Sequence, residues 1–193
     1  MVVRVPIRGS GTVPRMTSID PLTQLASRQH FIRFLEEQWL CAAPSHGQVA
    51  LLIVDVDFFQ RFNETRGSQA GDACLSRLAA VIAARIKRAS DLAARYGGEE
   101  FAVVLSGADE AGALGVAHWL RAEIEQQGIP HGASSVSDYV TVSIGVAVGT
   151  PLAGGSPERL IAAAEAALSR AKELGRNAVI AGPATNGSHA GTC

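Results

Sequence analysis

Two pairs of acidic residues follow stretches that could form strands, namely Asp55 with Asp57 and Glu99 with Glu100. The first pair comes directly after the apolar run VALLIV, and the second comes directly after two glycines. A protein scaffold often displays its reactive groups where elements end, and adjacent strands would bring the two pairs together. Clustered carboxylate oxygens suit Mg²⁺, which keeps several waters and completes its shell with substrate phosphates. The alternative, that a hairpin tip only carries solvated acids, stays open on these residues alone.

The apolar pattern of the first half of the chain predicts the elements that would hold these acids. The continuous run at 49–54 has the length of a strand that is buried on both faces. Helical spacing of apolar residues predicts helices that end near Cys41 and that cover about 69–88. Two short strand-like runs follow, at 92–96 and 101–105. They are joined through Gly97-Gly98, which would supply the positive φ of a tight hairpin.

The second half of the chain predicts two more helices and two more strands. They are a helix over 109–127, a strand over 139–148, a helix from Pro157 to a Gly175 terminator, and a short strand over 178–181. Because a hairpin interrupts the alternation of strands and helices, the predicted fold class is α/β of the α+β kind. We expect a central mixed, mostly antiparallel sheet of about five strands, flanked by helices and carrying a Gly-Gly β-hairpin.

Composition limits the classes of function. The 193 residues have room for one domain over 18–182, with a flexible lead at 1–17 and a flexible tail at 183–193. The 17 basic and 18 acidic residues leave no surplus of positive charge, which argues against nucleic acid or a membrane surface as a partner. Three distant cysteines without a CxxC pair, and the lack of a signal peptide, predict a cytoplasmic protein.

The segment RYGGEEF at 95–101 resembles the signature of the GGDEF family, the diguanylate cyclases, in a GGEEF variant. Other family motifs are matched in the same order by DPLT at 20–23, DVDFF at 55–59, Asn63 with Gly71-Asp72, SIGV at 143–146, and Ala171-Lys172 with Gly175-Arg176-Asn177. The resemblance runs from about residue 20 to residue 181. It implies a fold like the catalytic core of nucleotide cyclases, with a ferredoxin-like core.

The resemblance implies that two GTP molecules are condensed into cyclic di-GMP with release of pyrophosphate. It assigns Mg²⁺, or Mn²⁺, to Asp55 and Glu99 with help from the Val56 carbonyl, and it places Glu100 beside them as a further catalytic residue. Asp57 receives no firm role. Each domain of the family holds one GTP, so a homodimer is expected to be the active form.

Several substrate contacts are also implied by the resemblance. Backbone amides around Phe58 and Phe59, in a turn that opens a short helix, would bind phosphate with Lys172 and Arg176. Lys172 and Arg176 could instead only place charge near a helix C-terminus. The guanine edge would be read by Asn63 and Asp72. Asp72 could also serve as an acid near a helix N-terminus, and the two roles are compatible.

The resemblance further points to feedback and to one departure from the family. Arg88 and Asp91 form an RxxD sequence where the family binds its product as an allosteric inhibitor, although an exposed Arg at a helix end is the local alternative. Gln60 stands where many relatives place a phosphate-binding Lys. The competing hypotheses are therefore a weak or silent domain that binds cyclic di-GMP or GTP, and an enzyme that makes a mixed GMP-AMP product. His131 is expected to be an exposed loop residue without a role.

Overall fold

The structure is a computed structural model, and it describes residues 18–151 and 156–185. The predicted lead at 1–17 and residues 186–193 of the predicted tail lie outside the described residues. One sheet forms the centre of the described part. Its strands are β1 (Val49–Val56), β2 (Leu92–Arg95), β3 (Glu100–Ser106), β4 (Val142–Gly149) and β5 (Val179–Ala181).

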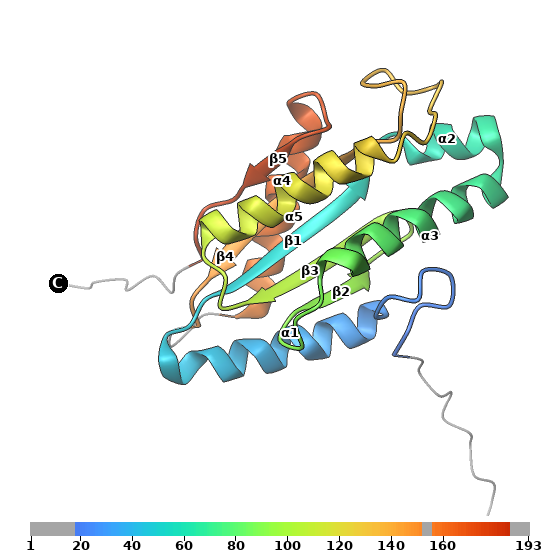
Figure 1. Cartoon of the computed structure of the whole chain (residues 1–193). Coiled ribbons are helices and arrows are strands. Elements are labelled where there is room, and N and C mark those ends of the chain that lie inside the picture. The colour runs from blue at the N-terminus through green and yellow to red at the C-terminus, as the bar shows by residue number, and fades with distance from the viewer. Residues whose placement is uncertain (1–17, 152–155, 186–193) are drawn as a thin grey trace, which may run out of the picture.

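The sheet is mixed and mostly antiparallel, which confirms the predicted fold class. Its strand order is β2-β3-β1-β4-β5. Strand β1 pairs antiparallel with both β3 and β4, β2 pairs antiparallel with β3, and only the β4–β5 pair is parallel. The first strand therefore lies in the middle, with the hairpin on one side and the second long strand on the other (Figure 1).

Helices cover both faces of this sheet, as Figure 1 shows. The helices are α1 (Arg28–Ala42), α2 (Phe59–Arg66), α3 (Ser68–Arg85), α4 (Glu110–Gln126) and α5 (Pro157–Glu173), with a short 3-10 turn at Ala43–Ser45. One core cluster joins α2, α3 and α4 to one face of the sheet, and the other joins α1 and α5 to the opposite face. None of the helices in the described ranges is long and apolar enough to cross a membrane.

Strand β1 shows why its apolar run is continuous. All eight of its residues are buried. Alternate side chains enter opposite clusters, so that Leu52 and Val54 pack under α3 and α4 while Leu51 and Ile53 pack under α1 and α5. A strand with helices on both faces needs apolar residues at every position until it emerges. Asp55 is therefore the first polar residue of the strand, and it faces the α1/α5 side.

Close packing of α5 on β4 depends on Gly145. A Cβ at this position would overlap the backbone of α5 at the Ala164 carbonyl and the Leu168 amide. The absence of a side chain thus lets the helix approach the strand directly. This contact sets how close α5 lies to the sheet. It therefore also positions the C-terminal end of α5, which carries Lys172, relative to the end of β1.

The turn of the hairpin corrects one prediction. Neither Gly97 nor Gly98 is among the residues with positive φ. The turn is closed instead by the Glu100 carbonyl, which accepts from the amides of Tyr96 and Gly97 at 2.8 and 3.1 Å. Gly97 leaves room for the Glu100 carboxylate, since a Cβ there would lie 2.5 Å from its Oε2. The glycine therefore serves side-chain packing rather than an unusual backbone angle.

Candidate functional site

The end of β1 and the tip of the β2–β3 hairpin lie next to each other. Asp55 is directly opposite Glu100 in the antiparallel register, and the Val56 amide donates to the Glu99 carbonyl at 3.4 Å. As cross-strand partners, Asp55 and Glu100 point to the same side of the sheet. Glu99 comes immediately before β3. The two predicted acid groups are thus brought to one edge of the molecule by the pairing of two strands.

A cavity of about 210 Å³ opens at this edge. Its lining combines all three predicted metal ligands with cationic and backbone groups, namely Asp55, Val56, Phe58, Phe59, Gln60, Arg61, Glu99, Lys172 and Arg176. Asp55 is only 6% exposed. Its Oδ2 lies 2.8 Å from the Lys172 ammonium, which is the only ion pair of Asp55 among the described residues.

The surroundings of Asp55 change its acidity. Burial is the main cause and raises the pKa of Asp55 from 3.8 to about 6. Lys172 opposes this shift by its hydrogen bond and its charge, while the negative charges of Glu100 and Glu99 add to it. A carboxylate held in this state gains from any cation that enters the cavity, because a cation offsets both the desolvation and the repulsion.

The donors at this edge fit a hard divalent cation that is completed by its substrate. No group of three or more His, Cys, Asp and Glu side chains in the described ranges could hold a metal ion by itself. Two carboxylates, Asp55 and Glu99, and the carbonyl of Val56 nevertheless provide oxygen ligands, and Mg²⁺ commonly takes its remaining ligands from water and phosphate. Lys172 would have to yield its contact with Asp55 to a metal, and its side chain is 34% exposed and so has room to do so.

The turn between β1 and α2 presents backbone donors to the same cavity. Phe58, the N-cap of α2, has φ 54° and ψ 30°, which is the left-handed region. Within the described chain, no acceptor is bonded to the amides of Phe58, Phe59, Gln60 or Arg61. Free amides at the N-terminus of a helix bind anions well, because the helix dipole adds a partial positive charge.

A second, larger cavity of about 670 Å³ adjoins the first. It contains both predicted guanine contacts, Asn63 and Asp72, and Glu99 borders both cavities. The Asn63 Oδ1 is buried without a hydrogen-bond partner among the described residues. Gly71 makes this arrangement possible, since a Cβ at Gly71 would collide with that amide oxygen. A ligand that donates a hydrogen bond would satisfy the oxygen.

Asp57 has a structural position, away from the lining of these cavities. It is 1% exposed. Its carboxylate accepts hydrogen bonds from the Thr141 hydroxyl at 2.8 Å, the Ser143 hydroxyl at 2.7 Å and the backbone amide of Asn177 at 3.0 Å. These contacts join the end of β1 to β4 and to the turn after α5. Asp57 therefore holds the turn that carries Arg176, whose guanidinium lies 4.3 Å from the centre of the Phe58 ring.

The sequence profile described as "Diguanylate cyclase, GGDEF domain" matches residues 17–178. The chain belongs to the GGDEF family. Diguanylate cyclase A of Treponema denticola is 35% identical over 168 residues, which are 85% of this chain and 44% of that protein. Response regulator PleD of Caulobacter vibrioides is 36% identical over 163 residues, which are 83% of this chain and 35% of that protein. The chain thus spans less than half the length of these two relatives.

Solved GGDEF structures share the fold. The GGDEF domain of DgcB from Caulobacter crescentus, solved in complex with c-di-GMP, superposes with a TM-score of 0.77 at 33% identity, covering 91% of this chain and 98% of that one. Diguanylate cyclase SiaD from Pseudomonas aeruginosa, solved with its activator SiaC, gives a TM-score of 0.76 at 30% identity, covering 84% and 61%. The predicted family and fold are therefore confirmed.

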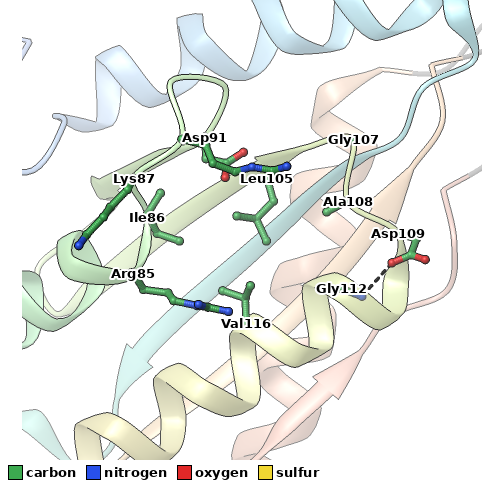
Figure 2. Close-up of a pocket in the computed structure, with 11 residues that line it drawn as sticks. Arg85, Ile86, Lys87, Asp91, Leu105, Gly107, Ala108, Asp109, Gly112 and Val116 are labelled. Atoms are coloured by element: carbon green, nitrogen blue, oxygen red, sulfur yellow. Dashed lines mark hydrogen bonds between the residues drawn. The ribbon is translucent and has the colours of Figure 1, made fainter.

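The RxxD residues of this GGDEF domain line a separate cavity of about 570 Å³, which lies between the end of α3, the hairpin and α4 (Figure 2). Arg85, Lys87 and Arg88 contribute positive charge to it. Asp91 is already engaged, because its Oδ1 accepts from the Ser106 amide at 3.2 Å. The helix before it ends at Arg85 rather than at Arg88, so Arg88 belongs to a loop.

His131 and Gln60 are two further residues of the site region. His131 is 1% exposed, so the prediction of an exposed loop histidine is wrong. Its Nε2 lies 3.2 Å from the Phe58 carbonyl, in the turn that borders the small cavity. Gln60 borders both cavities and donates to Glu64 Oε1 at 2.9 Å, so no cation extends from this position.

Proposed function

We propose that this domain joins two GTP molecules into cyclic di-GMP. In each half of the reaction the 3′-hydroxyl of one GTP attacks the α-phosphate of the other, a phosphorus–oxygen bond forms, and pyrophosphate leaves as the hydroxyl proton passes to solvent. Membership of the family supports this assignment. The observation that carries it is the small cavity in which Asp55 and Glu99 meet free helix amides, Lys172 and Arg176.

The triphosphate would lie along the positive side of this cavity. The amides of Phe58 and Phe59 would donate to its oxygens, and Lys172 and Arg176 would add charge. Asp55, Glu99 and the Val56 carbonyl would hold a divalent cation, which when bound activates the hydroxyl and neutralises charge on the departing pyrophosphate. Glu100 would add negative charge beside the metal ligands, and with it affinity for the cation.

The base would occupy the larger cavity. A carboxylate at Asp72 can accept from the N1 and N2 hydrogens of guanine, which adenine does not offer, and the Asn63 oxygen needs a donor. This chemistry favours GTP over ATP and disfavours a mixed product. An Asp72→Ala protein should lose most of its preference for GTP over ATP in a competition assay. Retention of the parent's preference would remove Asp72 from base recognition.

The bond must form between two facing domains, because each domain would hold one GTP. Purified protein should therefore convert GTP and Mg²⁺ to cyclic di-GMP and pyrophosphate at a rate that rises more steeply than protein concentration. An Asp55→Asn, Glu99→Gln protein is the matched control, and it should make neither product. Failure of the parent to form cyclic di-GMP at any protein concentration would contradict the proposal.

The product would inhibit through the cavity that contains Arg88 and Asp91. Arginines there can bind phosphate or the guanine edge in two-point contacts, and Asp91 can accept from a base. Arg88→Ala should relieve inhibition by added cyclic di-GMP while leaving the initial rate unchanged. Arg33→Ala, on the exposed side of α1 and outside the lining of this cavity, is the matched control for loss of a surface arginine, and it should leave inhibition intact.

A silent domain that binds cyclic di-GMP or GTP is the second candidate. Two observations favour it: Gln60 offers no cation to the phosphates, and the Lys172 ammonium is paired with the Asp55 carboxylate at 2.8 Å. Both hypotheses predict nucleotide binding, but only the cyclase hypothesis predicts pyrophosphate release. The turnover assay therefore separates them directly.

A further inference from the structure

The turn at Phe58 is held in a conformation that a free chain would rarely adopt. Its φ of 54° and ψ of 30° lie in the left-handed region, which is unfavourable for a residue with a large side chain. No side chain caps the N-terminus of α2. The direction in which the amides of residues 58–61 point depends on this one residue, so the contacts that fix Phe58 also fix the donors of the small cavity.

His131 binds the carbonyl of Phe58 from a distant part of the chain. Its Nε2 lies 3.2 Å from that oxygen, which also accepts from the Phe62 amide at 3.1 Å. A carbonyl can only accept, so Nε2 carries the hydrogen and the oxygen uses both lone pairs. Among the described residues the other ring nitrogen, Nδ1, is buried without a partner. The ring therefore has one polar contact, and that contact is with the turn.

The loop that carries His131 is closed by two backbone hydrogen bonds. The His131 amide donates to the Asp138 carbonyl at 2.7 Å, and the Val140 amide donates to the Ile129 carbonyl at 2.8 Å. This loop joins α4 to β4 and lies beside α2 (Figure 1). The imidazole also packs against Phe62 in a T-shaped arrangement, with ring centres 5.2 Å apart and an angle of 88°. His131 is thus held through both its backbone and its ring, and it is not a surface residue.

The ring of Phe58 is held as well as its carbonyl. The guanidiniums of Arg61 and Arg176 lie 4.8 and 4.3 Å from its centre. Both arginines border the small cavity. Contacts with Phe58 therefore link the free amides to the cationic side of the cavity, and His131 supplies the buried part of this support.

We propose that His131 is a positioning residue for the triphosphate, acting through its Nε2–H bond to the Phe58 carbonyl. This inference rests on the proposed function, because it assigns the held amides to GTP. The imidazole does not touch the nucleotide. It keeps the turn in the left-handed conformation, so that the amides of residues 58–61 face the phosphates before GTP arrives, and less ordering is needed on binding.

Four variants separate this role from simple packing. His131→Phe keeps a ring against Phe62 but removes the donor. His131→Asn carries an amide that ends near the position of Nδ1 and does not reach the carbonyl, whereas His131→Gln places its amide near the position of Nε2. His118→Phe, on the exposed face of α4, is the matched control for the same chemical change. Thermal unfolding of each protein establishes that it folds, and the Asn variant replaces the Phe variant if the latter does not.

The first measurement uses ligand-free protein and needs no activity. Hydrogen exchange, followed at single amides, should become at least about tenfold faster at Asp57 and Phe62 in the Phe and Asn variants, because these two amides are hydrogen-bonded in the turn and a bond that closes the turn is lost. The second measurement is steady-state turnover of GTP. These variants should raise KM by about fivefold to tenfold with kcat changed less than about twofold, as expected for a contact that supports ground state and transition state alike. The Gln variant and His118→Phe should match the parent in both.

The outcomes are distinguishable. An active His131→Phe or His131→Asn protein with the parent's exchange and the parent's KM would overturn the inference and leave the proposed function intact. A Gln variant as impaired as the Phe variant would also overturn it, because ring shape rather than the donor would then matter. A folded parent that neither binds GTP nor forms cyclic di-GMP would overturn the proposed function, and the positioning of a triphosphate with it.

Discussion

Replacing Asp55 by asparagine should abolish the proposed turnover and, at the same time, stabilise the metal-free protein at neutral pH. Asp55 is 6% exposed, and its pKa is raised from 3.8 to about 6 mainly by burial. A folded protein with such a group binds a proton more tightly than the unfolded chain does. Its stability therefore falls as pH rises from about 4 to about 6, and above that range the full cost of the buried charge remains.

The size of the effect follows from the two pKa values. The difference between 3.8 and about 6 corresponds to about 3 kcal/mol at pH 7, and to only about 0.5 kcal/mol at pH 4. Asparagine has nearly the same shape and no charge, so it avoids this cost. Lys172 loses its partner in the variant, but its side chain is 34% exposed and can turn to water. We therefore expect Asp55→Asn to be more stable than the parent by about 1–3 kcal/mol at pH 7.

Urea denaturation in the presence of EDTA, at pH 7 and at pH 4, measures both values. The gain should shrink to less than about 1 kcal/mol at pH 4, whereas Asp138→Asn, which changes an exposed carboxylate, should stay within about 0.5 kcal/mol of the parent at both pH values. Added Mg²⁺ should stabilise the parent and not the variant, because it binds only the folded site. A variant that is less stable than the parent at pH 7, or a gain that is the same at both pH values, would refute the reasoning.

Three further changes test other parts of the structure. Asp57→Asn should lower the free energy of unfolding by about 2–4 kcal/mol in urea denaturation, because the new side-chain NH₂ would face groups that now donate hydrogen bonds to the carboxylate. An equal loss for Asp138→Asn would contradict this. Gly145→Ala should cost about 3 kcal/mol or more in thermal unfolding, since its Cβ would overlap the backbone of α5, whereas Gly115→Ala, with open space around it, should be neutral or stabilising. Gln60→Lys should lower the KM for GTP by about fivefold to tenfold by adding a cation at both cavities, and an unchanged KM in a turnover assay would argue against a phosphate contact there.

The sheet could be predicted because its strands have strong and different signals. The run at 49–54 is apolar at every position, and the structure buries both of its faces. Element ends were less well predicted, for physical reasons that lie outside the elements. Strand β4 begins at Val142 rather than at 139, since Tyr139 pairs with Pro130 in the preceding loop. A loop that folds back on the start of a strand leaves no local pattern that separates the two.

The residues of the small cavity could be predicted from family motifs, but the reasons for their geometry could not. Asp57 belongs to the same motif as Asp55, and the motif gives it no firm role. Its actual partners are Thr141, Ser143 and Asn177, which come from two other segments and are between 84 and 120 residues away in the chain. Only the folded structure shows that these donors converge on the buried carboxylate. A motif therefore identifies which residues matter without separating those that bind from those that hold the binding residues in place.

His131 shows the same limit more sharply. A histidine in a loop that also contains proline and glycine has every local sign of exposure, and its partner is a backbone carbonyl. A carbonyl is common to every residue type, so no change in side chain at position 58 would report the bond in a comparison of sequences. The ring of His131 is buried because the loop after α4 packs against α2 at Phe62, and that contact depends on the fold. Support of this kind, from a distant polar side chain to a strained turn, has to be read from the fold.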